Sequence, residues 1–238
     1  MAARVTLACI LLIVTQVRAG AEGFLDLYGG PFINGTADLR VSETSFSETT
    51  SAAATIELSS STAFGARIGA WHPTHNWIGL GMDTGYLKAN GPGVDIDAFP
   101  LSVFLALRAP LLATTERPGG RLQPYVMAGF SVYWIDITAD VGGMGGSSVQ
   151  GGSSFYGGSG NAVLGPYLAA GLAWLPAKSL AIFCEYRHLN FDVGFDTVNS
   201  YFFPTVVGTV DSSVKADYLL FGISYRFLEG TPGKEASP

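Results

Sequence analysis

Apolar and polar residues alternate along eight segments of the chain, and the last segment is the clearest. A β-strand directs successive side chains to opposite faces, so a repeat of two indicates a strand with one apolar face. A helix would spread the same residues around its circumference. In the last segment the intervening positions carry Leu220, Gly222, Ser224 and Arg226. The apolar face consists of Leu219, Phe221, Ile223, Tyr225 and Phe227.

Seven further segments repeat this alternation, and the one near residues 24–31 is the least regular. Pro100 interrupts the segment at residues 99–107, because proline cannot donate to a strand ladder. We therefore expect either a bulge at Pro100 or regular pairing that begins after it. In nearly every segment the charged residue lies on the face opposite the apolar series. The charged positions are Asp26, Arg67, Asp83, Arg108, Glu185, Arg187 and Arg226.

Composition decides which kind of sheet these strands form. The chain is 48% hydrophobic and 13% charged, whereas soluble domains carry about 25% charged residues. The face opposite the apolar series is mostly Gly, Ala and Ser, which suits a crowded interior. The solvated face of a soluble sandwich would carry many Lys and Glu. The pattern therefore predicts an all-β, eight-stranded antiparallel up-and-down transmembrane β-barrel, apolar outward and polar inward.

The first residues have the plan of a secretory signal peptide. Arg4 precedes an apolar run at residues 5–14, and Ala19-Gly20-Ala21 suits a peptidase. The alternative is an N-terminal membrane anchor. We expect residues 1–21 to be the signal, 22–228 the barrel and 229–238 a short periplasmic tail. The formal net charge of −6 becomes more negative without the signal, which argues against nucleic acid as a partner.

The connections between the segments alternate in length. Residues 72–76 and 176–179 form tight turns and residues 110–120 a moderate one. Outer-membrane barrels have short periplasmic turns and longer extracellular loops, and aromatic girdles mark both edges of their apolar band. We expect Trp71, Trp77, Trp174 and Phe227 in the girdle beside the short turns, and Tyr86, Phe99, Trp134 and Tyr186 in the other. The expected long, mobile loops are residues 34–61, 88–94, 138–164 and 193–214.

Three short segments resemble the small outer-membrane barrels of the outer membrane protein A and opacity-porin type. They are Gln123 to Gly129, Glu185-Tyr186-Arg187 and the final Tyr225-Arg226-Phe227. The resemblance extends over residues 22–228 and implies a Gram-negative outer-membrane location. It also implies that the assembly machinery reads the terminal strand, with Leu219, Phe221, Ile223, Tyr225 and Phe227 as its signal. Residues 228–238 depart from the family, since many members end at the terminal aromatic residue.

An eight-stranded barrel is only just wide enough for its own side chains. The seven inward charges are expected to pair, because an unpaired buried charge is costly. Paired charges would form a rigid plug. A path for ions along the same charges is the alternative, which would make the protein a small-solute porin.

An enzyme that modifies lipid A is a less favoured possibility. Lipid A deacylases are also small barrels, and they use a His with a nearby Ser on a lipid-facing strand. His188 has the outward parity, but Asn190 stands where the Ser would be needed. His72 and His75 could bind metal, yet no third ligand is evident. We therefore predict no enzyme activity, no cofactor and no metal.

The prediction is a structural, surface-exposed barrel with at most weak pore activity. Polar loops on a rigid scaffold are where binding usually resides. Residues 34–61, 138–164 and 193–214 could therefore contact an extracellular ligand, although their composition names none. The other expected partners are outer-membrane lipid, lipopolysaccharide and the assembly machinery.

Overall fold

The computed structural model describes residues 21–45, 48–58, 60–92, 94–114, 119–140, 154–157, 162–199 and 206–227. It consists of ten strands, whose bounds are as follows: β1 Glu22–Ser45, β2 Glu48–Glu57, β3 Ser60–Trp71, β4 Ile78–Gly91, β5 Val94–Arg108, β6 Leu122–Asp140, β7 Ser154–Gly157, β8 Ala162–Ala177, β9 Leu180–Asn199 and β10 Val206–Phe227. Among these residues, no helix is both long enough and apolar enough to cross a membrane.

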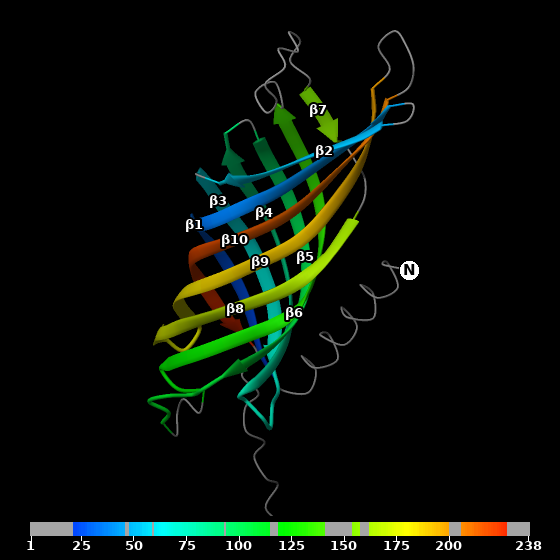
Figure 1. The fold of residues 1–238 in the computed structure, drawn as a ribbon. Helices are drawn as coiled ribbons and strands as arrows, with labels where there is room; N and C mark the ends of the chain where they lie inside the picture. The colour runs from blue at the N-terminus through cyan, green and yellow to red at the C-terminus, as the bar shows by residue number, and fades with distance from the viewer. Residues whose placement is uncertain are drawn as a thin grey trace, which may run out of the picture.

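Eight of the strands close into a barrel. The order β10-β9-β8-β6-β5-β4-β3-β1 is antiparallel throughout, and β10 pairs again with β1. This closure confirms the predicted eight-stranded antiparallel barrel. We call the β1–β10 pairing the seam, and the end of the barrel with the short turns the inner end. Figure 1 shows the strands running obliquely around the wall, with β2 and β7 at the opposite, outer end.

The outer end is built from extended strands where the sequence predicted loops. β1 continues to Ser45 and pairs with β2, and the outer half of β10 pairs with both β1 and β9. In the predicted loop at residues 88–94, residues 88–91 belong to β4 and β5 begins at Val94. The loop predictions were therefore largely wrong for these segments. Thr, Ser and Asp stand here at outward positions in place of apolar residues. The alternation of apolar and polar residues is therefore absent from the sequence, although β-forming residues such as Thr remain. Residues 141–153, 158–161 and 200–205 lie outside the described residues.

The outward face of the wall is an apolar belt. Leu27 is 54% exposed, and Phe130 is 69% exposed. The neighbouring inward residue Asp26 is only 5% exposed. This alternation recurs in every barrel strand and gives the apolar-outward arrangement that was predicted from the pattern.

Among the described residues, the buried charged side chains all lie in the inner half of the interior. The outer half of the lumen is filled by apolar side chains, including Ile56, Leu87, Ile96, Leu189 and Phe191. The expectation of a polar interior was therefore wrong for this half. The cluster members Ala37, Ile56, Leu58, Ala89 and Val214 lie in segments that were predicted as loops, so their inward orientation could not be assigned from the sequence.

Pro100 lies inside β5 without a bulge. The β4–β5 ladder passes from Thr84↔Leu101 to Leu87↔Ala98 in unchanged register, and Pro100 pairs with Tyr133 of β6. Thr84 Oγ1 donates a hydrogen bond to the Pro100 carbonyl at 3.2 Å. Neither predicted solution occurs: the register is the same on both sides of Pro100, and the β4–β5 ladder is interrupted only between these two pairs, where proline has no N–H to donate.

Inward aromatic rings lie over glycines on the neighbouring strand. At Gly222, an added Cβ would stand 2.4 Å from the Phe183 ring, which real contacts do not allow. Because the ring needs the space above its cross-strand partner, these positions accept no side chain, and the lumen face is rich in glycine. The paired residues are Phe24 and Gly69, Tyr28 and Gly65, Phe104 and Gly81, Tyr125 and Gly171, and Phe183 and Gly222.

Candidate functional site

Charged side chains cross the inner half of the lumen, and Arg67 of β3 is at their centre. Arg67 Nε donates to Asp26 Oδ2 at 2.8 Å, and its Nη1 donates to Glu185 Oε2 at 2.8 Å. The three side chains are between 0% and 7% exposed. Tyr125 Oη also donates to Glu185 Oε2, at 2.9 Å. Arg67 of β3 therefore connects its neighbour β1 to β9, which lies beyond β10 in the wall.

Arg187 of β9 forms the second half of this cluster. Its Nη2 lies 2.8 Å from Glu185 Oε1 and 3.1 Å from Asp83 Oδ2. Its Nη1 donates to Tyr28 Oη at 3.0 Å, and Tyr28 donates in turn to Asp83 Oδ1 at 2.7 Å. Tyr167 Oη also reaches Asp83, at 3.2 Å. We call the whole cluster the floor network: Asp26, Tyr28, Arg67, Asp83, Tyr125, Tyr167, Glu185 and Arg187.

A separate group of polar residues lies at the inner end. Arg108 Nη2 contacts Glu22 Oε2 at 2.6 Å, and Arg108 Nε donates to the Asn76 carbonyl at 2.7 Å. Arg226 Nη1 stands 3.5 Å from Glu22 Oε1. The guanidinium of Arg108 lies 4.1 Å from the centre of the Trp71 ring, a cation–π contact. Glu22 thus joins two arginines at this end.

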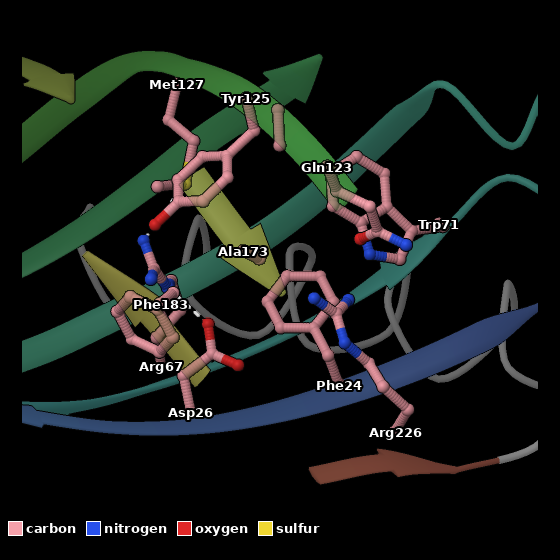
Figure 2. A pocket seen from close by; sticks show the side chains of 11 residues that line it. Phe24, Asp26, Arg67, Trp71, Gln123, Tyr125, Met127, Ala173, Phe183 and Arg226 are labelled. Atoms are coloured by element: carbon pink, nitrogen blue, oxygen red, sulfur yellow. Dashed lines mark hydrogen bonds and ion pairs between the residues drawn. The ribbon is translucent and has the colours of Figure 1, made fainter. Parts of the chain in front are cut away.

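A small pocket separates the inner-end group from the floor network. Figure 2 shows Phe24, Trp71 and Arg226 on one side of it and Asp26 and Arg67 on the other. Its volume is about 20 Å³, and a space above about 10–15 Å³ holds one water molecule. Within the described residues, Asp26 Oδ1 and the Nε and Nη1 atoms of Arg226 have no hydrogen-bond partner. The pocket is therefore large enough for one water molecule and too small to be a path for solutes.

The arrangement places charge of both signs deep inside the barrel. An isolated charge costs several kcal/mol in such surroundings, and close pairs with further hydrogen bonds offset that cost. Each of the eight barrel strands contributes a polar side chain to the floor network or the inner-end group. The geometry is that of a crosslinked interior. Among the described residues, no group of three or more His, Cys, Asp and Glu side chains could hold a metal ion.

The seven predicted charges all lie inside the barrel, but not in one group. Asp26, Arg67, Asp83, Glu185 and Arg187 meet in the floor network, whereas Arg108 and Arg226 lie with Glu22 at the inner end. Sequence reasoning missed Glu22, because it follows the expected signal cleavage site directly. The tyrosines of the floor network were also missed. Their inward parity in alternating strands was the available signal.

Two groups of predicted residues lie elsewhere. Leu219, Phe221, Ile223, Tyr225 and Phe227 follow the outward face of β10 beside the seam. Trp71 was expected in an aromatic girdle, and this was wrong. Trp71 is 5% exposed and packs inside the lumen against Phe24 and Arg108. It shares the inward parity of Arg67 and Gly69, so the repeat of two along β3 already placed this side chain inside.

The histidines singled out from the sequence lie on the outside. His72 and His75 occupy the turn between β3 and β4, with ring centres 5.1 Å apart. His72 Nδ1 accepts the backbone N–H of His75 at 3.1 Å. His188 lies on the outward face of β9, and its Nδ1 is 2.8 Å from Asp217 Oδ1 on β10. The sequence did not predict the contact with Asp217, because the two residues come from different strands.

No protein-family model and no curated protein matches the sequence. Among solved structures, the outer membrane protein OprG from Pseudomonas aeruginosa is 13% identical with a TM-score of 0.56, over 87% of this chain and 96% of that chain. This is the fold of an outer-membrane β-barrel. Neisserial surface protein A is 14% identical with a TM-score of 0.43, over 87% and 97% of the two chains. AlkL, solved in lipid bilayers, is 12% identical with a TM-score of 0.47, over 89% and 93%.

Proposed function

We propose that the protein is a non-enzymatic barrel of the bacterial outer membrane, with a closed lumen and strand hairpins presented at the cell surface. The apolar belt on the outward face supports insertion in a membrane, because large side chains such as Phe130 would otherwise meet water. On this proposal the inner end faces the periplasm.

The observation that carries the closed lumen is the floor network. Its two arginines and three carboxylates meet in the inner half of the barrel at distances of 2.8 to 3.1 Å. The outer half is filled by apolar side chains such as Leu87, Ile96 and Phe191. Hydrated ions would have to displace paired charges and then cross an apolar section. The porin alternative is therefore the weaker proposal.

Conductance in planar bilayers tests the closed lumen. We expect the purified protein to insert without discrete single-channel steps in 1 M KCl. Substitution of both arginines, Arg67→Ala and Arg187→Ala, together with Leu87→Ala and Phe191→Ala, removes the two cationic crosslinks and opens the apolar section, and should produce measurable steps. A matched control is Arg40→Ala, because Arg40 is exposed on the outer part of β1. Discrete conductance of the unmodified protein would overturn the closed lumen.

Location is tested by outer-membrane fractionation together with gel mobility before and after boiling. A folded barrel should resist SDS until it is boiled and should fractionate with outer-membrane markers. Recovery in a soluble fraction would contradict the proposed location.

We also propose that the outer hairpins contact an extracellular ligand. β10 has 22 residues, and at about 3.3 Å per residue and a tilt of about 40° it rises about 55 Å. The apolar band of such barrels is about 25 Å tall, so the β1–β2 hairpin extends well beyond the membrane. Loss of cell adhesion after replacement of residues 42–51 by a tight turn, with the SDS resistance of the barrel retained, would support this role. Unchanged adhesion would show that the β1–β2 hairpin does not contact the ligand.

A further inference from the structure

A furrow crosses the outward wall of the barrel. It has a volume of about 460 Å³, within the roughly 300–1,000 Å³ of pockets that hold small ligands. Its lining is almost entirely apolar until it reaches β9. The lining includes Leu105, Leu107, Ala128, Ala170, Tyr186 and His188.

The strand register explains why the wall is hollowed at this place. Residues that pair directly across the sheet share one face, and here they form the row Leu105↔Ala128↔Leu168↔His188. Ala128 lies between two leucines in this row. Ala170 is the small residue of the next row, beside Tyr186. The two alanines leave a depression with leucine side chains along its borders.

The furrow ends at a polar cluster. Asp217 Oδ1 accepts a hydrogen bond from Tyr186 Oη at 2.6 Å, and it lies 2.8 Å from His188 Nδ1. Because Nδ1 is held by the carboxylate, Nε2 is the ring nitrogen left to meet a ligand. The His188 and Asp217 side chains are 37% and 26% exposed. The ring is therefore both fixed in place and accessible.

This cluster lies at the outer edge of the apolar belt. Asp217 precedes Phe227 by ten residues, which at about 3.3 Å per residue and a tilt of about 40° is about 25 Å along the barrel axis. That distance matches the apolar band of about 25 Å. Below Asp217, β10 presents Leu219 and Phe221 outward, and above it the exposed Lys215. Lys215 pairs with Asn190, so it is a diagonal neighbour of His188.

We propose that the furrow and its polar end form a binding site for one acylated, phosphorylated lipid of the outer leaflet, of the lipopolysaccharide type. The acyl chain lies in the furrow between the leucines. The phosphate meets His188 Nε2 and Lys215, while Asp217 and Tyr186 hold the imidazole in position. This site rests on the proposed membrane insertion, because only then does the furrow face lipid.

Native mass spectrometry of the purified full chain tests the site. The protein is mixed with lipopolysaccharide or with diacylglycerol, which has acyl chains and no phosphate, and then transferred to mild detergent. We expect one lipopolysaccharide per barrel to be retained. Ala170→Leu fills the furrow and His188→Gln removes the imidazole, and each should weaken retention by about tenfold, the equivalent of about 1.4 kcal/mol.

Two control variants make the same chemical changes elsewhere. Ala66→Leu adds the same side chain on the outward face of β3, and His75→Gln changes an exposed histidine of the β3–β4 turn. Both should retain lipid as the unmodified protein does. SDS resistance before boiling shows that each variant is folded. Failure of the unmodified protein to resist SDS or to fractionate with the outer membrane would count against the proposed function itself.

Three results would overturn the site. Equal retention of lipopolysaccharide by Ala170→Leu and the unmodified barrel would show that the furrow is not used. Equal retention of diacylglycerol and lipopolysaccharide would show that the phosphate is not recognised. Release of free fatty acid during incubation would show that the His188–Asp217 pair acts on the lipid instead of holding it.

Discussion

Glu185 has an unusual position among the lumen residues, since each of its two oxygens meets a different arginine. Oε2 accepts from Arg67 and Oε1 from Arg187, both at 2.8 Å. The side chain is fully buried. One carboxylate thus compensates two guanidinium groups, and its removal leaves both with too few partners.

Replacement of Glu185 by Gln should destabilise the barrel strongly. The amide keeps the volume of the side chain but loses its charge, and breaking a buried ion pair costs about 3–5 kcal/mol. The measurement is the free energy of unfolding by urea in lipid vesicles. Glu57→Gln is the control, because Glu57 is exposed on β2, and it should change stability by less than about 0.5 kcal/mol. Equal stability of the two variants would show that the floor network contributes little.

At the scale of elements, the seam is the contact with the greatest separation in sequence. It joins Gly23 of β1 to Phe227 of β10, and the Phe227 ring occupies the space above Gly23. Tyr225 stacks against Phe227 with ring centres 6.2 Å apart. The terminal aromatic residues therefore cover the inner end of the seam, in addition to their proposed role in assembly.

Phe227→Ala should weaken closure of the barrel at this end. Complete burial of a phenylalanine side chain contributes about 1.5–3 kcal/mol to stability. Because Phe227 is partly exposed, the stability lost in Phe227→Ala should lie at the lower end of that range. The measurement is the fraction of protein that keeps its folded mobility in SDS as temperature rises. Phe221→Ala makes the same change on the same strand, away from the Gly23 contact. If the two variants melt alike, the ring above Gly23 does not secure the seam.

The strands could be predicted from the sequence because each barrel strand carries its own repeat of two. Asp26 between Leu25 and Leu27 is enough to assign three side chains to their faces. The partners of each charge could not be predicted, because Arg67 meets Glu185 from a strand far along the chain. The outer strands could not be predicted for a different reason. β2 and the outer half of β10 lie beyond the apolar belt, and their outward residues are polar.

At the scale of the whole molecule, the charges that crosslink the lumen are hidden from solvent. Arg67, Arg187 and their carboxylate partners are all at most 7% exposed. Salt screens exposed charges over about 3 Å at 1 M ionic strength, but buried pairs much less. The electrostatic part of the stability should therefore be insensitive to the surrounding electrolyte.

We expect the free energy of unfolding to change by less than about 1 kcal/mol between 0.05 and 1 M NaCl. This limit is the contribution of one exposed ion pair. Urea unfolding in vesicles of uncharged lipid measures this. The Glu185→Gln variant is the control, since its exposed charges are the same. A steep loss of stability with salt would show that the important ion pairs are at the surface.

On the proposed insertion in a membrane, the contacts of Arg67 have a mechanical consequence for the surrounding bilayer. This single side chain reaches Asp26 on β1, Met127 on β6 and Glu185 on β9, so it holds opposite walls at a fixed separation. A barrel braced in this way keeps its cross-section when the lateral pressure of the membrane changes. Where the hydrocarbon thickness does not match the apolar belt, the lipids must stretch or compress around the protein. The protein then acts as a stiff inclusion that imposes its own thickness on the nearest shell of lipid.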